Sequence, residues 1–259
     1  SRWLEERYYL VFGEPELALI PLLCDPSRDA IDVGANHGCY AMIMRKYARQ
    51  VIAFEPNPAL SSQLADKFSD DVTVRPLALS RSSGMAELHV PIIDGRDVSG
   101  LASLDDSHPL PGAGDHEIVV PTRALDDAFW GDVGFIKIDV EGHESAVLEG
   151  AHTTIARCRP KALVELEERH AVGAIGRARQ FFSDLNYQGY FLREGRVRPI
   201  EEFDATTMQR SEDVQKINPQ RVHAAPDTYT NNFLFVPAEQ SGLIGRLNDA
   251  LRSRVLVHA

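Results

Sequence analysis

A turn of small and polar residues near the start of the chain has the composition of a ligand-binding loop. It reads Asp32-Val33-Gly34-Ala35-Asn36-His37-Gly38 and lies between an apolar run and a helical pattern. Glycine adopts positive φ angles without steric cost and asparagine tolerates them, so the chain can turn sharply here. Glu55 follows Gly34 by 21 residues, at the end of the next apolar run. In an open parallel sheet both positions lie at the carboxyl edge, where ligands bind and a carboxylate can accept hydrogen bonds from both hydroxyls of a ribose.

Two adenosine cofactors are bound by such a turn and carboxylate. A dinucleotide site needs the spacing G-x-G-x-x-G, which directs backbone N–H groups at a pyrophosphate. This turn has the spacing G-x-N-x-G, which disfavours NAD. S-adenosylmethionine has no phosphate, and its ammonium group would suit the carboxylate of Asp32. The pattern therefore favours S-adenosylmethionine; in the alternative, the glycines only make a tight connection and Glu55 is a solvated strand end.

Acidic residues also follow two later apolar runs. Asp139 and Glu141 come after residues 134–138, and Glu165 lies in the run 162–166. Transfer of a methyl group to an alcohol oxygen requires the hydroxyl proton to leave, and a positioned base contributes ~10²–10⁴-fold to such a step. Alignment of the reacting atoms can contribute more, on the order of 7–11 kcal/mol. We predict that Asp139 is the base and that Glu141 or Glu165 orients the acceptor hydroxyl; alternatively, Asp139 caps the helix that follows.

Carboxylates at neighbouring strand ends can also hold Mg²⁺, which prefers oxygen ligands. The residues here do not match the Asp and Asp-Asn pattern of metal-dependent O-methyltransferases, so Mg²⁺ stays open and no metal ligand is predicted. Lys137 lies inside the preceding apolar run, and we expect its ammonium to pair with a neighbouring carboxylate. His143 is expected on a helix surface.

The elements that must position these residues alternate between strand and helix patterns, which is typical of a βαβ sheet. We predict seven sheet strands at residues 30–33, 51–54, 72–79, 134–138, 162–166, 187–192 and 232–236, with a further extended segment at 85–91. Helices are predicted at residues 39–48, 141–155 and 175–185, and from residue 58.

We expect a single domain over residues 1–259. A helical lead-in covers 1–28, the core covers 29–238, and a C-terminal helix or tail covers 239–259. Residues 94–115 and 201–227 do not fit the alternation and are treated as insertions, either lids over a site or plain surface loops.

The composition excludes several classes of protein. The 259 residues are 44% hydrophobic, as expected for a globular protein, and the formal net charge of −11 disfavours nucleic acid and anionic membranes as partners. Three cysteines without metal-ligand spacing indicate neither a disulfide framework nor a zinc site. No apolar run approaches the ~20 residues of a membrane span, so we expect a cytoplasmic protein. The chain starts with Ser1, so the presence of a removed targeting segment stays open.

Several of these segments together resemble the FkbM family of S-adenosylmethionine-dependent methyltransferases. They are residues 32–38, Phe54-Glu55-Pro56-Asn57, Ala78-Leu79-Ser80 followed by Gly84, residues 135–144, 147–151 and 231–235. The resemblance implies a class I methyltransferase (Rossmann-like) fold, an α/β three-layer sandwich around a mainly parallel seven-stranded sheet whose last strand is antiparallel. It also implies O-methylation of a hydroxyl on a sugar, glycan or polyketide-type small molecule.

The resemblance also assigns positions to the cofactor. Gly34, Asn36 and Gly38 would pass beside its methionine part, Glu55 would hold the ribose, and Asp139 would lie near the methyl group. Ala78 and Leu79 would lie against the adenine. The full set of predicted cofactor-binding residues is Asp32, Gly34, Ala35, Asn36, Gly38, Glu55, Pro56, Asn57, Ala78, Leu79 and Asp139.

Three other functions are weighed. Enzymes that methylate nitrogen commonly carry Asn or Asp followed by Pro-Pro and an aromatic residue, whereas this chain has Asp139-Val140-Glu141-Gly142. An NAD-dependent oxidoreductase is disfavoured by the glycine spacing and by the lack of an obvious Tyr-x-x-x-Lys relay. A non-catalytic cofactor-binding module would not need the acidic residues at the strand ends. The sequence gives no prediction of the oligomeric state.

Overall fold

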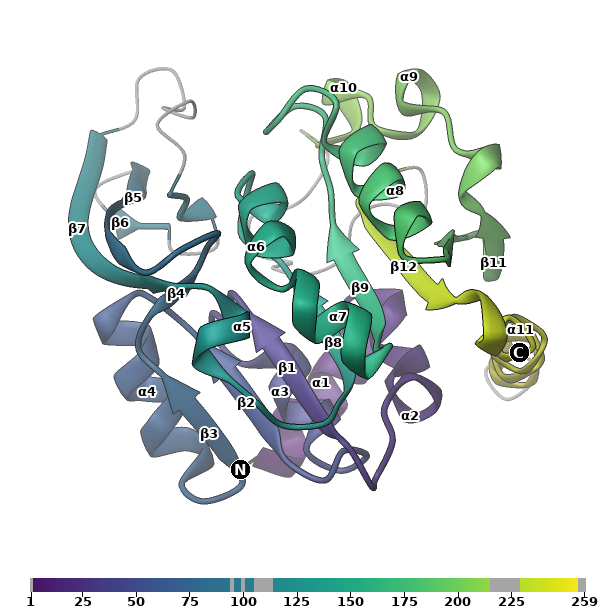
Figure 1. Ribbon diagram of the computed structural model, residues 1–259, viewed down its shortest axis with the longest axis horizontal. Helices are drawn as coiled ribbons and strands as arrows, with labels where there is room; N and C mark the ends of the chain where they lie inside the picture. The colour runs from purple at the N-terminus through teal and green to yellow at the C-terminus, as the bar shows by residue number, and fades with distance from the viewer. Residues whose placement is uncertain (1, 94–95, 99–100, 105–113, 215–228, 256–259) are drawn as a thin grey trace.

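The centre of the molecule is an eight-stranded sheet with the strand order β11-β10-β12-β9-β8-β1-β2-β3 (Figure 1). The computed structural model describes residues 2–93, 96–98, 101–104, 114–214 and 229–255. The strands are β1 (Asp29–Val33), β2 (Val51–Phe54), β3 (Val72–Arg75), β8 (Val133–Ile138), β9 (Lys161–Glu165), β10 (Tyr187–Arg193), β11 (Arg196–Pro199) and β12 (Asn232–Pro237).

The pairing directions confirm a mainly parallel sheet. Strands β3, β2, β1, β8 and β9 pair in parallel, whereas β12 is antiparallel to both β9 and β10. The main sheet has a strand at each of the seven predicted places, although the one predicted over 72–79 ends at Arg75, and β11 adds an eighth at the edge. The sequence prediction did not include β11. In the structure, Glu194 and Gly195 form a two-residue turn between β10 and β11, with φ angles of 52° and 69°. A turn with two positive φ angles matches the twist of a hairpin.

Helices cover both faces of the sheet, and the strand period of two sends alternate residues to opposite layers. Ala30 and Phe135 belong to a core shared with α1, α3, α4 and α11, whereas Ile31 and Ile136 belong to a core shared with α5 to α8. The helices are α1 (Arg2–Phe12), α2 (Ile20–Leu23), α3 (Cys39–Met44), α4 (Pro58–Phe68), α5 (Leu125–Ala128), α6 (Glu144–Gly150), α7 (His152–Cys158), α8 (Ala174–Asp184), α9 (Ala205–Met208), α10 (Ser211–Val214) and α11 (Leu243–Val255). The predicted three-layer arrangement is therefore confirmed.

A second, four-stranded sheet with the order β4-β7-β5-β6 lies beside the main one (Figure 1). It comprises β4 (Ala78–Leu79), β5 (Gly84–Ile93), β6 (Arg96–Asp97) and β7 (Gly114–Arg123). Its inner face contributes Ala78, Leu88, Val90 and Val120 to a small core. The sequence prediction of one strand over 72–79 was wrong, because the chain leaves β3 at Pro76 and enters β4 of this other sheet.

Two other predicted elements have different limits. The helix predicted at residues 141–155 begins at Glu144, because Glu141 and Gly142 have φ angles of 52° and 107°, and Ala151 divides it into α6 and α7. In the predicted insertion 201–227, residues 201–214 form a 3₁₀ turn, α9 and α10. Most of the predicted insertion 94–115 and the remainder of 201–227 lie outside the described residues.

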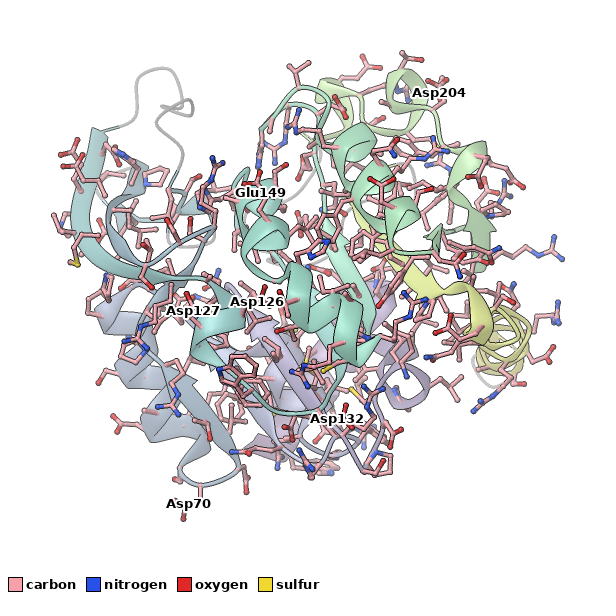
Figure 2. All side chains as sticks on the ribbon, in the orientation of Figure 1. Asp70, Asp126, Asp127, Asp132, Glu149 and Asp204 are labelled. Atoms are coloured by element: carbon pink, nitrogen blue, oxygen red, sulfur yellow. The ribbon has the colours of Figure 1, made fainter. Side chains whose placement is uncertain are left out.

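Many carboxylates lie on the outside of the molecule, and Figure 2 labels six of them. The side chains of Asp132 and Glu149 are 56% and 55% exposed. Asp126 has a structural role, because its two oxygens accept hydrogen bonds from Thr153 N and Thr154 N at the start of α7. In the described part of the chain, no helix is long and apolar enough to cross a membrane.

The side chain of Asn57 caps the N-terminus of helix α4. Its N-cap residue Asn57 accepts hydrogen bonds from Ala59 N at 3.0 Å and Leu60 N at 3.4 Å. We predict that Asn57→Ala lowers the free energy of unfolding by about 1 kcal/mol, because these N–H groups lose their acceptor. Urea denaturation measures the loss, and Asn57→Ser, which retains a capping oxygen, should preserve most of the stability. An equal loss in both variants would contradict the cap.

Candidate functional site

A cavity lies at the carboxyl ends of β1, β2 and β8, where the main sheet meets the second sheet. It encloses about 610 Å³ of space, part of which is open to solvent. Its apolar wall includes Leu88, Ala102 and Leu104 beside the second sheet. Eight residues predicted for the site line it: Gly34, Asn36, Glu55, Pro56, Ala78, Leu79, Asp139 and Glu141.

The turn after β1 forms one edge of the cavity because of its backbone conformation. Gly34 has a φ of 77°, and a Cβ added there would lie 1.8 Å from the carbonyl oxygen of Asp139. Asn36 has a φ of 48°. Gly38 also has a φ of 77°, and a Cβ there would lie 2.7 Å from Leu64 Cδ2 on α4. Both glycines therefore permit close approaches that a side chain would block.

Glu55 is fixed at the end of β2 by two backbone donors. Its side chain accepts hydrogen bonds from Asn36 N and Asn57 N, both at 2.8 Å, and the residue is 5% exposed. Burial raises the pKa of Glu55, while the two N–H groups act in the opposite direction. Each carboxylate oxygen has more than one acceptor direction, so the pair can still accept from two neighbouring hydroxyls.

A polar atom without a partner lies beside Glu55. The side-chain Oδ1 of Asn36 is buried and has no hydrogen bond to any described atom. A buried acceptor of this kind is costly unless a donor reaches it. The acceptors Glu55 and Asn36 Oδ1 therefore fit the hydroxyl and amino groups of an adenosine cofactor, with the apolar wall beside the base.

The other five predicted residues do not line the cavity, and their roles in ligand binding stay predictions. Asp32 is 2% exposed and accepts a hydrogen bond from Ala41 N at 3.0 Å; burial raises its pKa to about 7. Ala35 donates its backbone N–H to Phe54 O. The remaining three are Gly38 and Asn57, which contact α4, and Glu165, which lies one strand further along the sheet.

Lys137 is the centre of the acidic group at the strand ends. Its side chain is 0% exposed, and its Nζ lies 3.4 Å from Asp139 Oδ2 and 3.9 Å from Glu165 Oε2. It also donates to Asn232 Oδ1 at 3.2 Å and lies 5.0 Å from the centre of the Tyr40 ring. Burial by itself would lower the pKa of Lys137, but the carboxylates outweigh this and raise it. The predicted pairing of this ammonium is thus confirmed.

Sequence reasoning missed Glu14, which joins this group from the segment before β1. Its Oε2 accepts hydrogen bonds from Tyr40 Oη at 2.5 Å and Asn232 Nδ2 at 3.1 Å. Carboxylate oxygens of Glu14, Asp139 and Glu165 lie within 4.8 Å of one another. Burial raises the pKa of Glu14 and raises that of Glu165 well above its usual value. No local pattern distinguishes Glu14, since its partners lie in distant parts of the chain.

A second carboxylate pairs with a histidine at the same edge of the sheet. His170 Nδ1 lies 2.8 Å from Glu141 Oε2, and the two side chains are 11% and 16% exposed. Burial would lower the pKa of His170, but the Glu141 carboxylate raises it. His143 lines the cavity and contacts Ser80 Oγ at 2.9 Å, so its expected place on a helix surface was wrong. Asp139 does not cap α6, which starts at Glu144 with His143 at the N-cap position.

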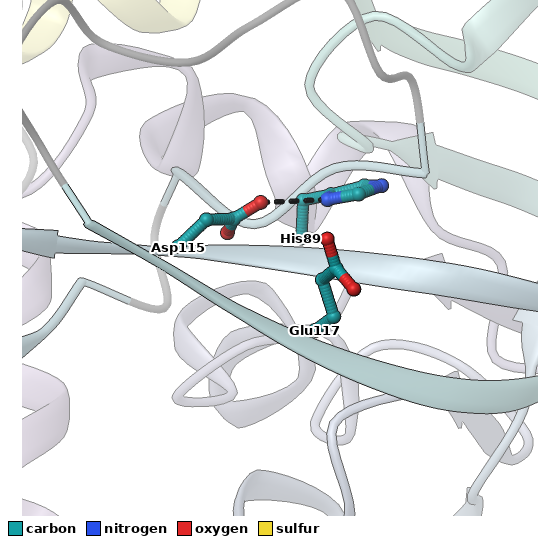
Figure 3. A group of neighbouring side chains, drawn as sticks. All are labelled: His89, Asp115 and Glu117. Atoms are coloured by element: carbon teal, nitrogen blue, oxygen red, sulfur yellow. Dashed lines mark hydrogen bonds and ion pairs between the residues drawn. The ribbon is translucent and has the colours of Figure 1, made fainter.

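Among the residues that the structure describes, two groups of side chains have a spacing that could hold a metal ion. The group of Glu14, Asp139 and Glu165 already has the Lys137 ammonium beside it. The other consists of His89, Asp115 and Glu117 on β5 and β7, with His89 Nδ1 2.6 Å from Asp115 Oδ2 (Figure 3). Because Leu88 faces the cavity and strand residues alternate, His89 lies on the opposite face of the second sheet. This second group is therefore separate from the cavity.

Comparisons with known proteins agree with this arrangement. The family model described as "Methyltransferase FkbM domain" matches residues 32–189, more than half of the chain. The structure of a methyltransferase FkbM from Methylobacillus flagellatus KT matches with a TM-score of 0.52 and 16% identity, over 90% of this chain and 50% of that one. An O-methyltransferase from Thermotoga maritima matches at 0.42 and 10% identity, over 86% of this chain and 64% of that one. The search of curated proteins finds no match.

The mainly parallel sheet, with the cavity at the carboxyl edge of β1, β2 and β8, has the class I methyltransferase fold. The chain spans about half the length of the Methylobacillus protein. On the family match, it belongs to the FkbM methyltransferase family.

Glu16 tests the electrostatics of the segment before β1. It is 7% exposed, and burial raises its pKa from 4.5 to about 8. The folded protein holds this proton more tightly than the unfolded chain does, so the resulting stabilisation is complete below pH 4.5 and is lost as pH rises to about 8. We predict that Glu16→Gln, which is neutral throughout, gains stability over the wild type across this range, by at least about 1 kcal/mol at the upper end.

Urea denaturation at the two ends of this range measures the difference. Glu149→Gln, at an exposed position on α6, is the matched control and should show no such trend. A difference between Glu16→Gln and wild type that does not change with pH would contradict the assignment.

Proposed function

We propose that the protein is an S-adenosylmethionine-dependent O-methyltransferase that acts on a hydroxyl group of a sugar, glycan or polyketide-type small molecule. The observation that carries the proposal is the fixed Glu55 carboxylate beside the orphan Asn36 Oδ1, in a cavity that ends at Asp139.

The residues of the cavity divide into two parts with different tasks. Glu55 would accept the two ribose hydroxyls, while Ala78, Leu79 and Leu88 would contact the adenine. The Gly34 turn would lie beside the methionine part, with Asn36 Oδ1 as an acceptor for an N–H or O–H donor. When bound, S-adenosylmethionine supplies a methyl group on a positively charged sulfur.

Asp139 is the proposed base. Its side chain is 28% exposed, lines the cavity and pairs with Lys137, so it can meet a substrate while its position stays fixed. As the bound cofactor gives its methyl group to the acceptor oxygen, Asp139 would take the proton that leaves the acceptor hydroxyl. Glu141, held by His170, also lines the cavity and would orient the acceptor.

The charge of the cavity argues against a dinucleotide. Among the described residues that line it, Glu55, Asp139 and Glu141 carry carboxyl groups, whereas His143 is the one basic residue. A pyrophosphate would be repelled by such a wall, and the turn after β1 lacks the glycine spacing that surrounds phosphates. Nitrogen as acceptor is less well supported, because Val140 and Glu141 stand where nitrogen methyltransferases commonly have prolines.

Glu55 tests cofactor recognition. We predict that Glu55→Ala weakens the binding of S-adenosylmethionine and S-adenosylhomocysteine by roughly 10–100-fold, because two hydrogen bonds to a charged group are lost. Isothermal titration calorimetry provides both dissociation constants. Glu149→Ala, on the exposed face of α6, is the control. Unchanged affinity in Glu55→Ala would remove this residue from the site.

Asp139 tests the chemistry. Mass spectrometry of a cell extract incubated with protein and isotopically labelled S-adenosylmethionine should first reveal a newly methylated acceptor. With that acceptor, Asp139→Asn should reduce kcat by ~10²–10⁴-fold. The affinity for S-adenosylhomocysteine should stay within about threefold of the wild type, because Asp139 lies near the methyl group, which this ligand lacks. Turnover at the wild-type rate would exclude Asp139 as the base.

A further inference from the structure

The segment before β1 places a carboxylate at the proposed reaction centre. Glu14 directly precedes the 3₁₀ helix Pro15–Leu19, and its side chain reaches the ends of β8, β9 and β12. The hydroxyl of Tyr40 from α3 and the amide of Asn232 from β12 both donate to its Oε2. Two separate parts of the chain, α3 and β12, therefore fix this carboxylate beside Asp139.

The charges around Asp139 are out of balance. The oxygens of Glu14, Asp139 and Glu165 share a region in which all lie within 4.8 Å of one another. In the described part of the chain, Lys137 is the one cation that forms ion pairs with these carboxylates. Asp32 lies opposite Lys137 in the register of β1 and β8 and adds another acidic group on the same side.

Burial and hydrogen bonding act differently on the members of this group. Burial raises the pKa of Glu165 well above its usual value, and Asp139 raises it further, which favours the protonated form of Glu165. Burial also raises the pKa of Glu14, but the Lys137 ammonium and the two donors on one Glu14 oxygen act against burial and favour the ionised form. Glu14 and Asp139 then leave a negative charge that a single ammonium does not neutralise.

We propose that Glu14 is a positioning residue of the reaction centre, whose charge makes the cavity beside Asp139 prefer the positively charged sulfur of S-adenosylmethionine over the neutral sulfur of its demethylated product. This inference rests on the proposed function, because it assumes that the cofactor lies with its methyl group toward Asp139. The preference would favour exchange of product for fresh cofactor. The same charge would assist departure of the proton as positive charge develops on the acceptor oxygen.

Calorimetry on the wild type and three variants tests this role without an acceptor. The quantity compared is the ratio of the dissociation constants of S-adenosylhomocysteine and S-adenosylmethionine. In Glu14→Gln, which keeps an acceptor for Tyr40 and Asn232 but loses the charge, the preference for S-adenosylmethionine should fall about tenfold. In Glu14→Asp, which keeps the charge, most of the preference should remain.

Glu16→Gln is the matched control. Glu16 is a buried carboxyl two residues away in the same segment, but it is not a member of the carboxylate group, so its loss should leave the ratio unchanged. If Glu14 had a purely structural role, its substitution would weaken the binding of both ligands equally. The ratio of the two dissociation constants would then equal that of the wild type, and this result would overturn the proposal. An equal fall in Glu14→Gln and Glu14→Asp would overturn it as well.

The failure of the proposed function would look different. In that case neither ligand would bind to the wild type. If Glu14→Gln fails to fold, as seen by circular dichroism, the ratio in Glu14→Asp at increasing salt provides the second measurement. Salt screens a partly buried charge less than an exposed one, so the preference for S-adenosylmethionine should persist at high salt. A ratio of dissociation constants that falls to one at high salt would contradict a contribution from a charge inside the site.

Discussion

The ammonium of Lys137 is buried in the middle of a sheet that is covered on both faces, and a buried charge must be paired. This requirement organises the functional end of the molecule. Asp139 directly follows the strand that contains Lys137. Glu165 ends the neighbouring strand, and Asn232 begins the antiparallel strand beyond it. Removal of one partner would leave an uncompensated charge, which is strongly destabilising in proteins. The same contacts that satisfy Lys137 therefore hold the acidic side chains at the mouth of the cavity.

The cavity itself depends on two features of the backbone. The turn at Gly34 brings β1 against the carbonyl of Asp139, at a distance that excludes any side chain. The second sheet then supplies the apolar wall through Leu88 and its neighbours. One side of the cavity thus offers fixed acceptors for hydroxyl and amino groups, and the other offers a surface for a flat ring. The acidic group around Asp139 lies where the two sides end.

The sequence predicted the parts of this arrangement that are local. Residues 134–138 form a run that is apolar except for Lys137, because β8 is buried on both faces. Asn57 and Pro58 mark the start of α4 because capping and a fixed φ act within a few residues. The turn after β1 and the carboxylate of Glu55 were predicted for the same reason, because residue types at fixed positions along the sequence identify them.

Other parts depend on contacts that no local pattern contains. The second sheet was not predicted, because β7 exposes most of one face and pairs with β5 across a long connection. The predicted start of the 141–155 helix was wrong because Glu141 adopts a positive φ, which is uncommon for a glutamate. Glu14 was not assigned to the site, since its contacts with Tyr40 and Asn232 lie 26 and 218 residues away.

The central claim is that the Glu55 cavity holds S-adenosylmethionine rather than a dinucleotide. Isothermal titration calorimetry of the unmodified protein with S-adenosylmethionine, S-adenosylhomocysteine and NAD⁺ tests it most directly. The geometry and charge of the cavity predict that the first two bind at a single site and that NAD⁺ gives no heat of binding. Binding of NAD⁺ without binding of S-adenosylmethionine would contradict it.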